Sequence, residues 1–173
     1  YSYYARCTED NYFMQINNNQ ITEGTKIDAS TFTGGQLQRF TFIPVKGTEN
    51  YMIAPERSSN VVFGVTEVVT GAEIELQEKT GAVTQQWKLM KNTDGSYMIL
   101  AAENDSLKMM STAYGTNPLR LSPLAKKFWL YRCDAMDDKL ETSTETTYTP
   151  SGMYVSSVKD SRGYTTSYTY NEN

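Results

Sequence analysis

The amino-acid sequence predicts an all-β fold built from three similar lobes, each made of four short strands. One observation is a motif that ends in an aromatic residue and occurs three times, at Gln38-Arg39-Phe40, Gln85-Gln86-Trp87 and Lys126-Lys127-Phe128. The second is the triplet Tyr51-Met52-Ile53, which recurs as Tyr97-Met98-Ile99. The third is that apolar residues alternate over short runs, and no stretch shows sustained helical periodicity. Repeats of this kind set the architecture of a chain.

Each aromatic motif is preceded by a segment that ends in an apolar residue. These segments are Gly24-Thr25-Lys26-Ile27, Gly71-Ala72-Glu73-Ile74 and Thr116-Asn117-Pro118-Leu119. The last segment lies closer to its aromatic residue than the other two, so the third lobe is expected to have a shorter loop. Turn-forming residues such as Gly34-Gly35 and Thr93-Asp94-Gly95 separate the apolar runs. The order of these signals predicts four short strands in each lobe.

Three such lobes are expected to close around a pseudo-threefold axis. A single lobe of four short strands leaves its apolar face and its strand edges unprotected, whereas three lobes form a barrel with one shared core. Residues 1–133 supply the three lobes. With 173 residues, the chain is long enough for this domain and an appendage.

This pattern resembles the ricin-type lectin β-trefoil, in which each lobe ends in a Gln-x-Trp motif. The motif stands here as Gln38-x-Phe40, as Gln85-x-Trp87 and, in a departed form, as Lys126-x-Phe128. The resemblance covers about residues 1–133 and implies an all-β, β-trefoil fold followed by a linker and a short β-hairpin. The three aromatic residues are expected to be core side chains that meet where the lobes join.

The polar members of the motif are also expected to be structural. A glutamine amide both donates and accepts hydrogen bonds, so Gln38 and Gln85 can satisfy backbone groups of a neighbouring turn that would otherwise be buried unpaired. Lys126 cannot accept a hydrogen bond. The third lobe is therefore expected to hold its turn differently.

Sugar-binding members of the ricin-type family carry three characteristic residues in one lobe: an aspartate on the second strand, an aromatic platform just after the third strand, and an asparagine before the motif glutamine. The aspartate position falls on Gln15, Phe63 and Lys108, the platform position on Ser30, Gln77 and Ser122, and the asparagine position on Leu37, Thr84 and Ala125. No lobe keeps the set. An acceptor carboxylate and a stacked ring give such a shallow pocket its selectivity, so the usual mode of galactose binding is not expected.

The first lobe comes nearest to a replacement for these residues. Gln15, Asp28 and Gln36 are polar, and Phe32 is an aromatic residue near the expected platform. These four residues are the carbohydrate-binding candidates. The alternative is that they are ordinary solvated loop residues.

The two cysteines, Cys7 and Cys133, are too far apart in sequence for a zinc pair and too few for a disulfide framework. In the trefoil that the resemblance implies, they lie on or next to neighbouring strands at the two ends of the domain. One disulfide and two reduced, buried thiols are both open interpretations. A disulfide would stabilise the fold by up to roughly 4 to 5 kcal/mol.

The sequence changes character after Cys133. Residues 134–151 are polar, with a run rich in Thr, Ser and Glu, and are typical of a linker. Residues 152–173 resemble part of one tyrosine- and aspartate-containing (YD) repeat of bacterial Rhs-type proteins, with Asn171 where the family usually has aspartate. The resemblance implies a β-hairpin in a secreted or cell-surface bacterial protein that carries further repeats.

Composition excludes several classes of function. The chain has no histidine, which removes the most usual general base and the commonest metal ligand. Its 16 basic and 20 acidic residues give a net charge of −4 without a basic cluster, so no nucleic-acid partner is expected. No apolar run is long enough to cross a membrane. We therefore expect no cofactor, no metal and no membrane insertion.

We expect a non-catalytic protein, because carboxylates such as Glu73, Glu75 and Glu78 form neither a paired acid nor a nucleophile constellation. One hypothesis is a lectin-like module of a larger bacterial secreted or surface protein. Its partners would be a glycan or cell-wall polysaccharide and the other domains of its own chain. The other is a structural spacer or protein-interaction trefoil that has lost sugar binding.

Overall fold

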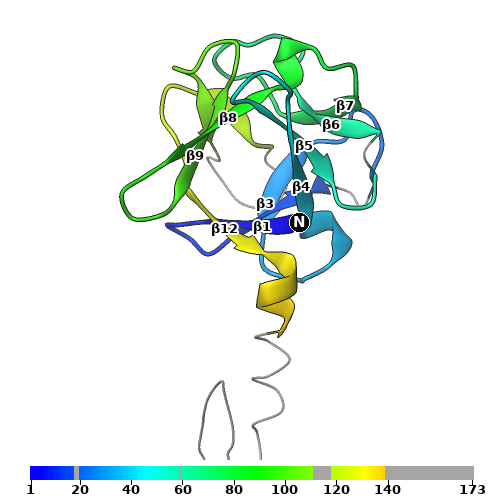
Figure 1. Cartoon of the computed structure of the whole chain (residues 1–173), viewed down its shortest axis with the longest axis vertical. Helices are drawn as coiled ribbons and strands as arrows, with labels where there is room; N and C mark the ends of the chain where they lie inside the picture. The colour runs from blue at the N-terminus through cyan, green and yellow to red at the C-terminus, as the bar shows by residue number, and fades with distance from the viewer. Residues whose placement is uncertain (18–19, 59, 111–117, 139–173) are drawn as a thin grey trace, which may run out of the picture. The chain divides into compact units, whose positions relative to one another are not determined.

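The computed structural model describes residues 1–17, 20–58, 60–110 and 118–138 (Figure 1), and its first compact unit is Tyr1–Cys133. Each predicted lobe contains four strands, so the predicted repeat is confirmed. Lobe one holds β1 (Ser2–Cys7), β2 (Phe13–Ile16), β3 (Ile27–Ser30) and β4 (Phe40–Pro44). Lobe two holds β5 (Tyr51–Pro55), β6 (Val61–Gly64), β7 (Glu75–Glu78) and β8 (Trp87–Lys91). Lobe three holds β9 (Tyr97–Ala101), β10 (Lys108–Met110), β11 (Arg120–Ser122) and β12 (Phe128–Arg132).

The first and fourth strands of the lobes form a closed, six-stranded antiparallel barrel. Its order is β1-β4-β5-β8-β9-β12, and β12 pairs again with β1. The longest pairings join successive lobes, β4 to β5, β8 to β9 and β12 to β1. The second and third strands of each lobe form a hairpin. A barrel with three such hairpins is the β-trefoil arrangement.

Three backbone hydrogen bonds in a closed ring mark the pseudo-threefold axis. The amide of Ile27 donates to the carbonyl of Ile74 at 3.3 Å, Ile74 donates to Leu119 at 2.9 Å, and Leu119 donates to Ile27 at 2.7 Å. All three side chains are fully buried. These residues end the three segments that the sequence places before the aromatic motifs. The predicted equivalence of the segments is therefore confirmed.

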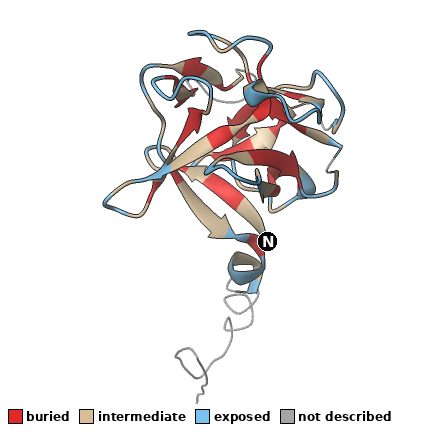
Figure 2. Ribbon diagram, turned by 45° about the horizontal axis from the view of Figure 1, so that its top comes forward, coloured by how far each residue is buried: buried red, intermediate tan, exposed pale blue. Residues whose placement is uncertain are grey.

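The three lobes share one hydrophobic core, and Figure 2 shows its buried residues along the barrel strands. Phe40, Trp87 and Phe128 are at most 1% exposed, as expected for core side chains. The indole nitrogen of Trp87 donates to the carbonyl of Phe63 at 3.1 Å, so its polar group is satisfied inside the core. The ring of Phe63 also packs edge-to-face on Phe40, with ring centroids 5.1 Å apart.

The first described residues after the trefoil are helical, and the predicted linker at residues 134–151 stays a prediction. Residues 133–138 form a short helix. A polar composition disfavours a buried strand but permits one or two helical turns, which need only local hydrogen bonds. The remainder of the predicted linker and the predicted Rhs-type repeat at residues 152–173 lie outside the described residues. None of the described helices has the length and apolar character needed to span a membrane.

Candidate functional site

Gln38 anchors the loop between β3 and β4 of lobe one. It ends the 3₁₀ helix η2 (Gln36–Gln38) and is fully buried. Its Oε1 accepts hydrogen bonds from the amides of Thr33 at 2.8 Å and Gly34 at 3.3 Å. Its Nε2 donates to the carbonyl of Thr31 at 2.7 Å and to Gln15 Oε1 at 3.0 Å. Gln38 therefore satisfies backbone groups of the turn, which is the structural role that its motif predicts.

A cavity of about 600 Å³ lies beside this anchored loop. One of its residues, Arg57, comes from the turn after β5 and therefore belongs to lobe two. The Arg57 guanidinium donates a hydrogen bond to Gln36 Oε1, so the two lobes meet at the cavity. We call this site the lobe-one cavity, and its lining consists of Gln15, Ile21, Thr33, Gly35, Gln36, Leu37 and Arg57.

The polar groups of the lobe-one cavity are mainly hydrogen-bond donors. The Oε1 atoms of Gln15 and Gln36 accept from Gln38 and Arg57, which leaves both Nε2 groups without a hydrogen bond among the described residues. Arg57 is the only charged residue in the lining, and within the described part of the chain no carboxylate forms an ion pair with it. Such a cavity suits a ligand that is rich in acceptor oxygens.

The structure separates the four carbohydrate-binding candidates into two pairs. Gln15 and Gln36 line the cavity, whereas Asp28 and Phe32 do not. The Phe32 ring packs on Tyr4 and on Phe13, with ring centroids 5.1 and 4.8 Å apart. Phe32 therefore belongs to an aromatic cluster outside the lobe-one cavity, and its role as a sugar platform stays a prediction. Asp28 is only 4% exposed and is not a solvated loop residue either.

The sequence missed Arg57, Ile21 and Thr33 as lining residues. Arg57 is 21 residues from its partner Gln36 and follows the first strand of the next lobe. No local motif connects the two positions. The pseudo-threefold repeat is the one signal that could have placed them together, because each lobe's fourth strand pairs with the next lobe's first strand.

Lobe two repeats the anchor with a different partner. Gln85, at the end of η3 (Val83–Gln85), accepts from the amides of Thr80 and Gly81 at 3.0 and 3.2 Å. It donates to the carbonyl of Glu78 at 2.8 Å and to Gln77 Oε1 at 3.1 Å. In lobe one the side-chain acceptor comes from β2, whereas in lobe two it comes from β7.

Strand register explains this exchange of partners. Gln15 pairs with Asp28, and the equivalent pair in lobe two is Gly64 with Glu75. A Cβ atom at Gly64 would lie 2.3 Å from Gln77 Oε1, so the Gln77 side chain fills the space above the glycine. Lobe two therefore has its glutamine amide where lobe one has Gln15, but it reaches that place from the opposite strand.

The same registers correct two sequence assignments. By strand pairing, the residues equivalent to Gln15 are Gly64 and Met110, whereas the sequence placed the aspartate position on Phe63 and Lys108. Each assignment was displaced along its strand, by one residue in lobe two and by two in lobe three. The loops between the second and third strands differ in length, and a residue count across such loops does not preserve register.

Lobe three holds its turn with an ion pair. Lys126 Nζ lies 3.1 Å from Glu9 Oε1 and 3.5 Å from Asp10 Oδ2, both in the turn after β1. The amide of Lys126 donates to the carbonyl of Met109 at 3.1 Å. Lobe three therefore differs from the other two lobes, as expected. An ion pair to lobe one stands where the other lobes have a buried glutamine amide.

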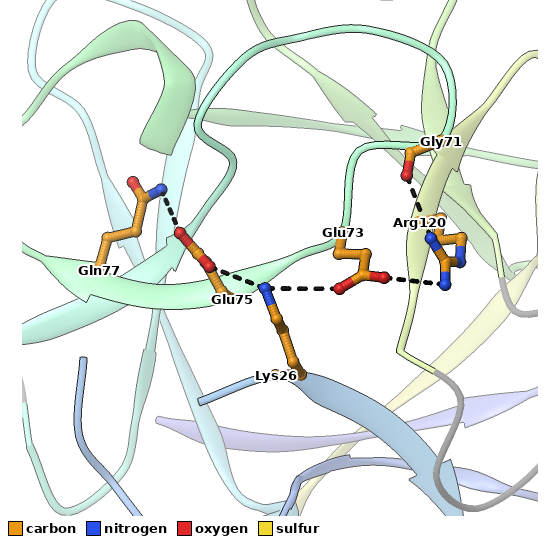
Figure 3. A network of polar contacts seen from close by, with 6 residues as sticks. All are labelled: Lys26, Gly71, Glu73, Glu75, Gln77 and Arg120. Carbon is orange, nitrogen blue, oxygen red and sulfur yellow. Dashed lines mark hydrogen bonds and ion pairs between the residues drawn. The ribbon is translucent and has the colours of Figure 1, made fainter. Parts of the chain in front are cut away.

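A polar network surrounds the pseudo-threefold axis (Figure 3). Lys26 Nζ lies 2.9 Å from Glu75 and 3.5 Å from Glu73, and Arg120 Nη2 lies 2.9 Å from Glu73. These contacts join lobe one to lobe two and lobe two to lobe three. The hydrogen bond to Glu75 is the main cause that raises the pKa of Lys26, so the cation is favoured.

Asp28 occupies the place where the third ion pair of this network would stand. It follows Ile27 as Glu75 follows Ile74, and its counterpart across the lobe boundary is Pro118, which carries no charge. Asp28 Oδ1 is buried without a hydrogen-bond partner. Burial raises the pKa of Asp28 from 3.8 to about 6. Ion pairs therefore link the lobes at two of the three boundaries around the axis, and Asp28 and Pro118 form no such pair at the third.

The two cysteines are buried thiols and do not form a disulfide. Cys7 lies opposite Phe128 in the β1–β12 pairing, and continuation of that register places Cys133 opposite Ser2. Five residues of extended strand separate Cys7 from Ser2, a distance of about 16 Å. A disulfide needs Cα atoms within about 7 Å, so that interpretation is wrong. Burial raises the pKa of Cys7 to about 12, which keeps its thiol protonated and unreactive.

Solved structures with similar folds include a designed protein, a glycosidase and a lectin. The designed threefold-symmetric protein ThreeFoil has a TM-score of 0.68 at 19% identity, over 76% of this chain and 98% of that protein. An exo-β-1,3-galactanase from Clostridium thermocellum has a TM-score of 0.68 at 14% identity, over 75% of this chain and 30% of that one. The Polyporus squamosus lectin, bound to a Neu5Acα2-6Galβ1-4GlcNAc epitope, has a TM-score of 0.63 at 14% identity, over 75% and 48%.

No family model and no curated protein matches the chain. The chain spans less than half of the galactanase and of the lectin, and nearly all of ThreeFoil. All three similarities lie below 25% identity, so they bear on the fold alone. Together with the closed barrel and its three hairpins, they show that residues 1–133 form a β-trefoil.

Proposed function

We propose that this chain is a non-catalytic carbohydrate-binding module and that the lobe-one cavity holds the sugar. The observation that carries the proposal is the position and lining of this cavity. It lies beside the anchored Gln38, and Gln15 stands at the position where sugar-binding members of the ricin-type family carry their aspartate. The trefoils of the lectin and the galactanase support a carbohydrate as the class of ligand.

The chemistry of the lining supports an altered mode of sugar binding. Gln15, Gln36 and Arg57 offer donors to hydroxyl, ring or carboxylate oxygens. Ile21 and Leu37 are partly buried side chains packed against the core, and they give the ligand an apolar wall. Without an aromatic platform in this cavity, charge-assisted hydrogen bonds from Arg57 become the strongest single contact available to the ligand.

The surrounding protein is proposed to be secreted or displayed on a bacterial surface and to continue in Rhs-type repeats. The support is the tyrosine-rich segment at residues 152–173 and the Thr- and Ser-rich composition before it.

The proposal that the chain is not an enzyme is supported by the ion pairs that its carboxylates form. Glu73 and Glu75 are held in ion pairs with Lys26 and Arg120 and are not poised as an acid and base pair.

A second candidate function is a trefoil that binds another protein or acts as a spacer. It is favoured by the absence of an aromatic ring from the described residues that line the lobe-one cavity. Under this alternative the lobe-one cavity would be a remnant of an ancestral sugar site.

Titration calorimetry on the whole chain, with ligands from a broad glycan array, tests the proposal. The key variant is Gln36→Ala, and its matched control is Val83→Ala, the equivalent position in η3 of lobe two. Loss of one sugar hydrogen bond is expected to weaken binding about fivefold in Gln36→Ala. Binding by Val83→Ala should equal that of the wild type. Silence of the whole array, or equal weakening by both variants, would contradict the lobe-one site.

A further inference from the structure

The open end of the barrel holds a second cavity, of about 660 Å³. Each of the six barrel strands contributes one side chain to its wall, and Tyr1 and Glu49 complete the lining. We call this site the barrel mouth, and its six strand residues are Tyr3 from β1, Phe42 from β4, Tyr51 from β5, Leu89 from β8, Tyr97 from β9 and Leu130 from β12.

The strand registers make the tyrosines of the barrel mouth equivalent. In every lobe, the first-strand tyrosine pairs with the motif aromatic of the fourth strand: Tyr3 with Phe40, Tyr51 with Trp87, and Tyr97 with Phe128. The other three wall residues follow those aromatics by two positions and so point to the same side of their strands. The fully buried motif aromatics thus form the next layer of the barrel and close its floor.

The aromatic wall is held in place by contacts between its own rings. Tyr3 packs edge-to-face on Phe42, with ring centroids 5.8 Å apart, and Phe42 packs in the same way on Tyr51 at 6.4 Å. All three side chains remain partly exposed. The rings therefore present apolar surface to the cavity without a prior rearrangement, which lowers the cost of ordering them when a ligand binds.

Glu49 places a carboxylate on one side of this wall. It lies in the β4–β5 turn, where Thr48 Oγ1 donates to the carbonyl of Val45 at 2.8 Å and accepts from the amide of Asn50 at 3.0 Å. Among the described residues that line the barrel mouth, Glu49 alone carries a charge.

Positive charges lie at the same end of the barrel. Lys91 and Arg132 lie opposite Tyr97 and Tyr3 in the strand pairings, and the Arg132 guanidinium lies 3.8 Å from the centroid of the Tyr1 ring. The rim therefore carries charges of both signs. This arrangement favours an uncharged polar ligand over an anion or a cation.

We propose that the barrel mouth binds the end of a neutral glycan chain. A sugar ring has an apolar face that stacks on aromatic side chains and hydroxyls that donate to a carboxylate. The barrel mouth has both components, whereas the lobe-one cavity has neither an aromatic ring nor a carboxylate in its lining. Because the floor is closed, a chain end enters the cavity and the middle of a chain does not. The inference rests on the proposed function as a carbohydrate-binding module but assigns a separate site.

The test is titration of the whole chain with four neutral disaccharides, namely lactose, cellobiose, maltose and chitobiose. The mouth variants are Tyr97→Leu and Glu49→Gln. Leucine already stands in the same wall at Leu89 and Leu130, so Tyr97→Leu is expected to keep the barrel folded. The matched controls are Tyr131→Leu, on the same strand as Leu130 but outside the cavity lining, and Glu67→Gln. Thermal unfolding monitored by circular dichroism verifies that every variant is folded.

We expect at least one disaccharide to bind, and each mouth variant to weaken its binding about tenfold or more. Both controls should bind within twofold of the wild type. If a disaccharide binds and only Arg57→Gln or Gln36→Ala weakens it, the barrel mouth is excluded while the proposed function stands. If none of the four binds but the array yields a ligand that needs Gln36, the inference again fails alone. If no glycan of any kind binds, both fail.

Discussion

Lobes one and two anchor the same loop with a buried glutamine, but the side-chain partner of that glutamine comes from a different strand in each lobe. Both bury a glutamine at the end of a 3₁₀ helix, and both need an amide oxygen beside it. Lobe one takes that oxygen from Gln15 on β2 and has the small Ser30 on β3, whereas lobe two has Gly64 on β6 and takes the oxygen from Gln77 on β7. The comparison teaches that the buried anchor of the turn can keep its amide partner while that partner moves to the neighbouring strand.

The largest effect is expected from removal of either anchor. Gln38→Ala and Gln85→Ala each leave two backbone amides and one carbonyl without their partner, and unsatisfied groups of this kind are costly. Each variant should lower the free energy of unfolding by about 3 to 4 kcal/mol, measured by urea denaturation. A clearly smaller loss in one lobe would show that the two anchors are not equivalent.

The next effect concerns Asp28, which corresponds to Glu75 of lobe two but has no cation beside it. The pKa of Asp28 is raised to about 6 in the folded state, so the folded protein holds its proton over a range where the unfolded chain has released it. This group therefore stabilises the fold fully below pH 4, and the contribution is lost as the pH rises through 6. The loss is on the order of 3 kcal/mol.

The variant Asp28→Asn isolates that contribution. Its free energy of unfolding should exceed that of the wild type at pH 8, and the difference should shrink as the pH falls from 7 to 4. Urea denaturation of both proteins at several pH values measures it, and subtraction of the wild type cancels the titration of all other carboxylates. A pH-independent difference would mean that Asp28 does not titrate in this range.

Exchange of the lobe-two residues for those of lobe one should return the amide partner of Gln85 from β7 to β6. Gly64→Gln alone places a side chain where Gln77 lies and should cost about 1 to 2 kcal/mol of unfolding free energy. Addition of Gln77→Ser recreates the Gln15 and Ser30 arrangement and should recover most of that loss. Denaturation of both single variants and the double variant gives the coupling energy. Additive losses would contradict the proposed exchange of side chains.

The smallest effect is expected for Arg57, and it is one of ligand choice. Galacturonate carries a carboxylate where galactose carries a hydroxymethyl group, so it should bind the lobe-one cavity about tenfold more tightly. Arg57→Gln should remove this preference, measured by calorimetry at two salt concentrations. The control is Glu103→Gln, at the equivalent position after the first strand of lobe three. Equal preference in both variants would exclude Arg57 as its source.

The fold could be predicted from the sequence because the patterns that mark its strands and turns occur three times. The apolar residues Ile27, Ile74 and Leu119 were placed as equivalents, and they form the hydrogen-bonded ring at the axis. The helical turn after Cys133 was not foreseen, because a polar composition predicts solvent exposure and not backbone conformation. The sequence left a disulfide between Cys7 and Cys133 open for a different reason. Neighbouring strands bring Cys7 and Cys133 to the same pairing, but only the register shows that they stand five residues apart along it.

The candidate site was only partly accessible. Gln15 was found because the family's aspartate position falls on it, and Gln36 because it is polar and precedes the motif glutamine. The contacts of Phe32 with Tyr4 were not foreseen, because a sequence does not reveal which way a ring packs. The positions Phe63 and Lys108 were misplaced because strand register is set by turn geometry and not by a residue count. Arg57 came from the next lobe, and its position depends on tertiary contacts that no local pattern encodes.

The most direct test of the central claim removes hydrogen-bond donors from the lobe-one cavity without touching the Gln38 anchor. The double variant Gln36→Ala with Arg57→Gln removes the Gln36 amide and the Arg57 guanidinium from the lining, and a glycan array would compare it with the wild-type chain. The account predicts that the wild type binds a defined set of glycans and that the folded double variant loses those bound through lobe one, acidic sugars first. Retention of every glycan by the double variant would contradict the claim that the lobe-one cavity binds sugar.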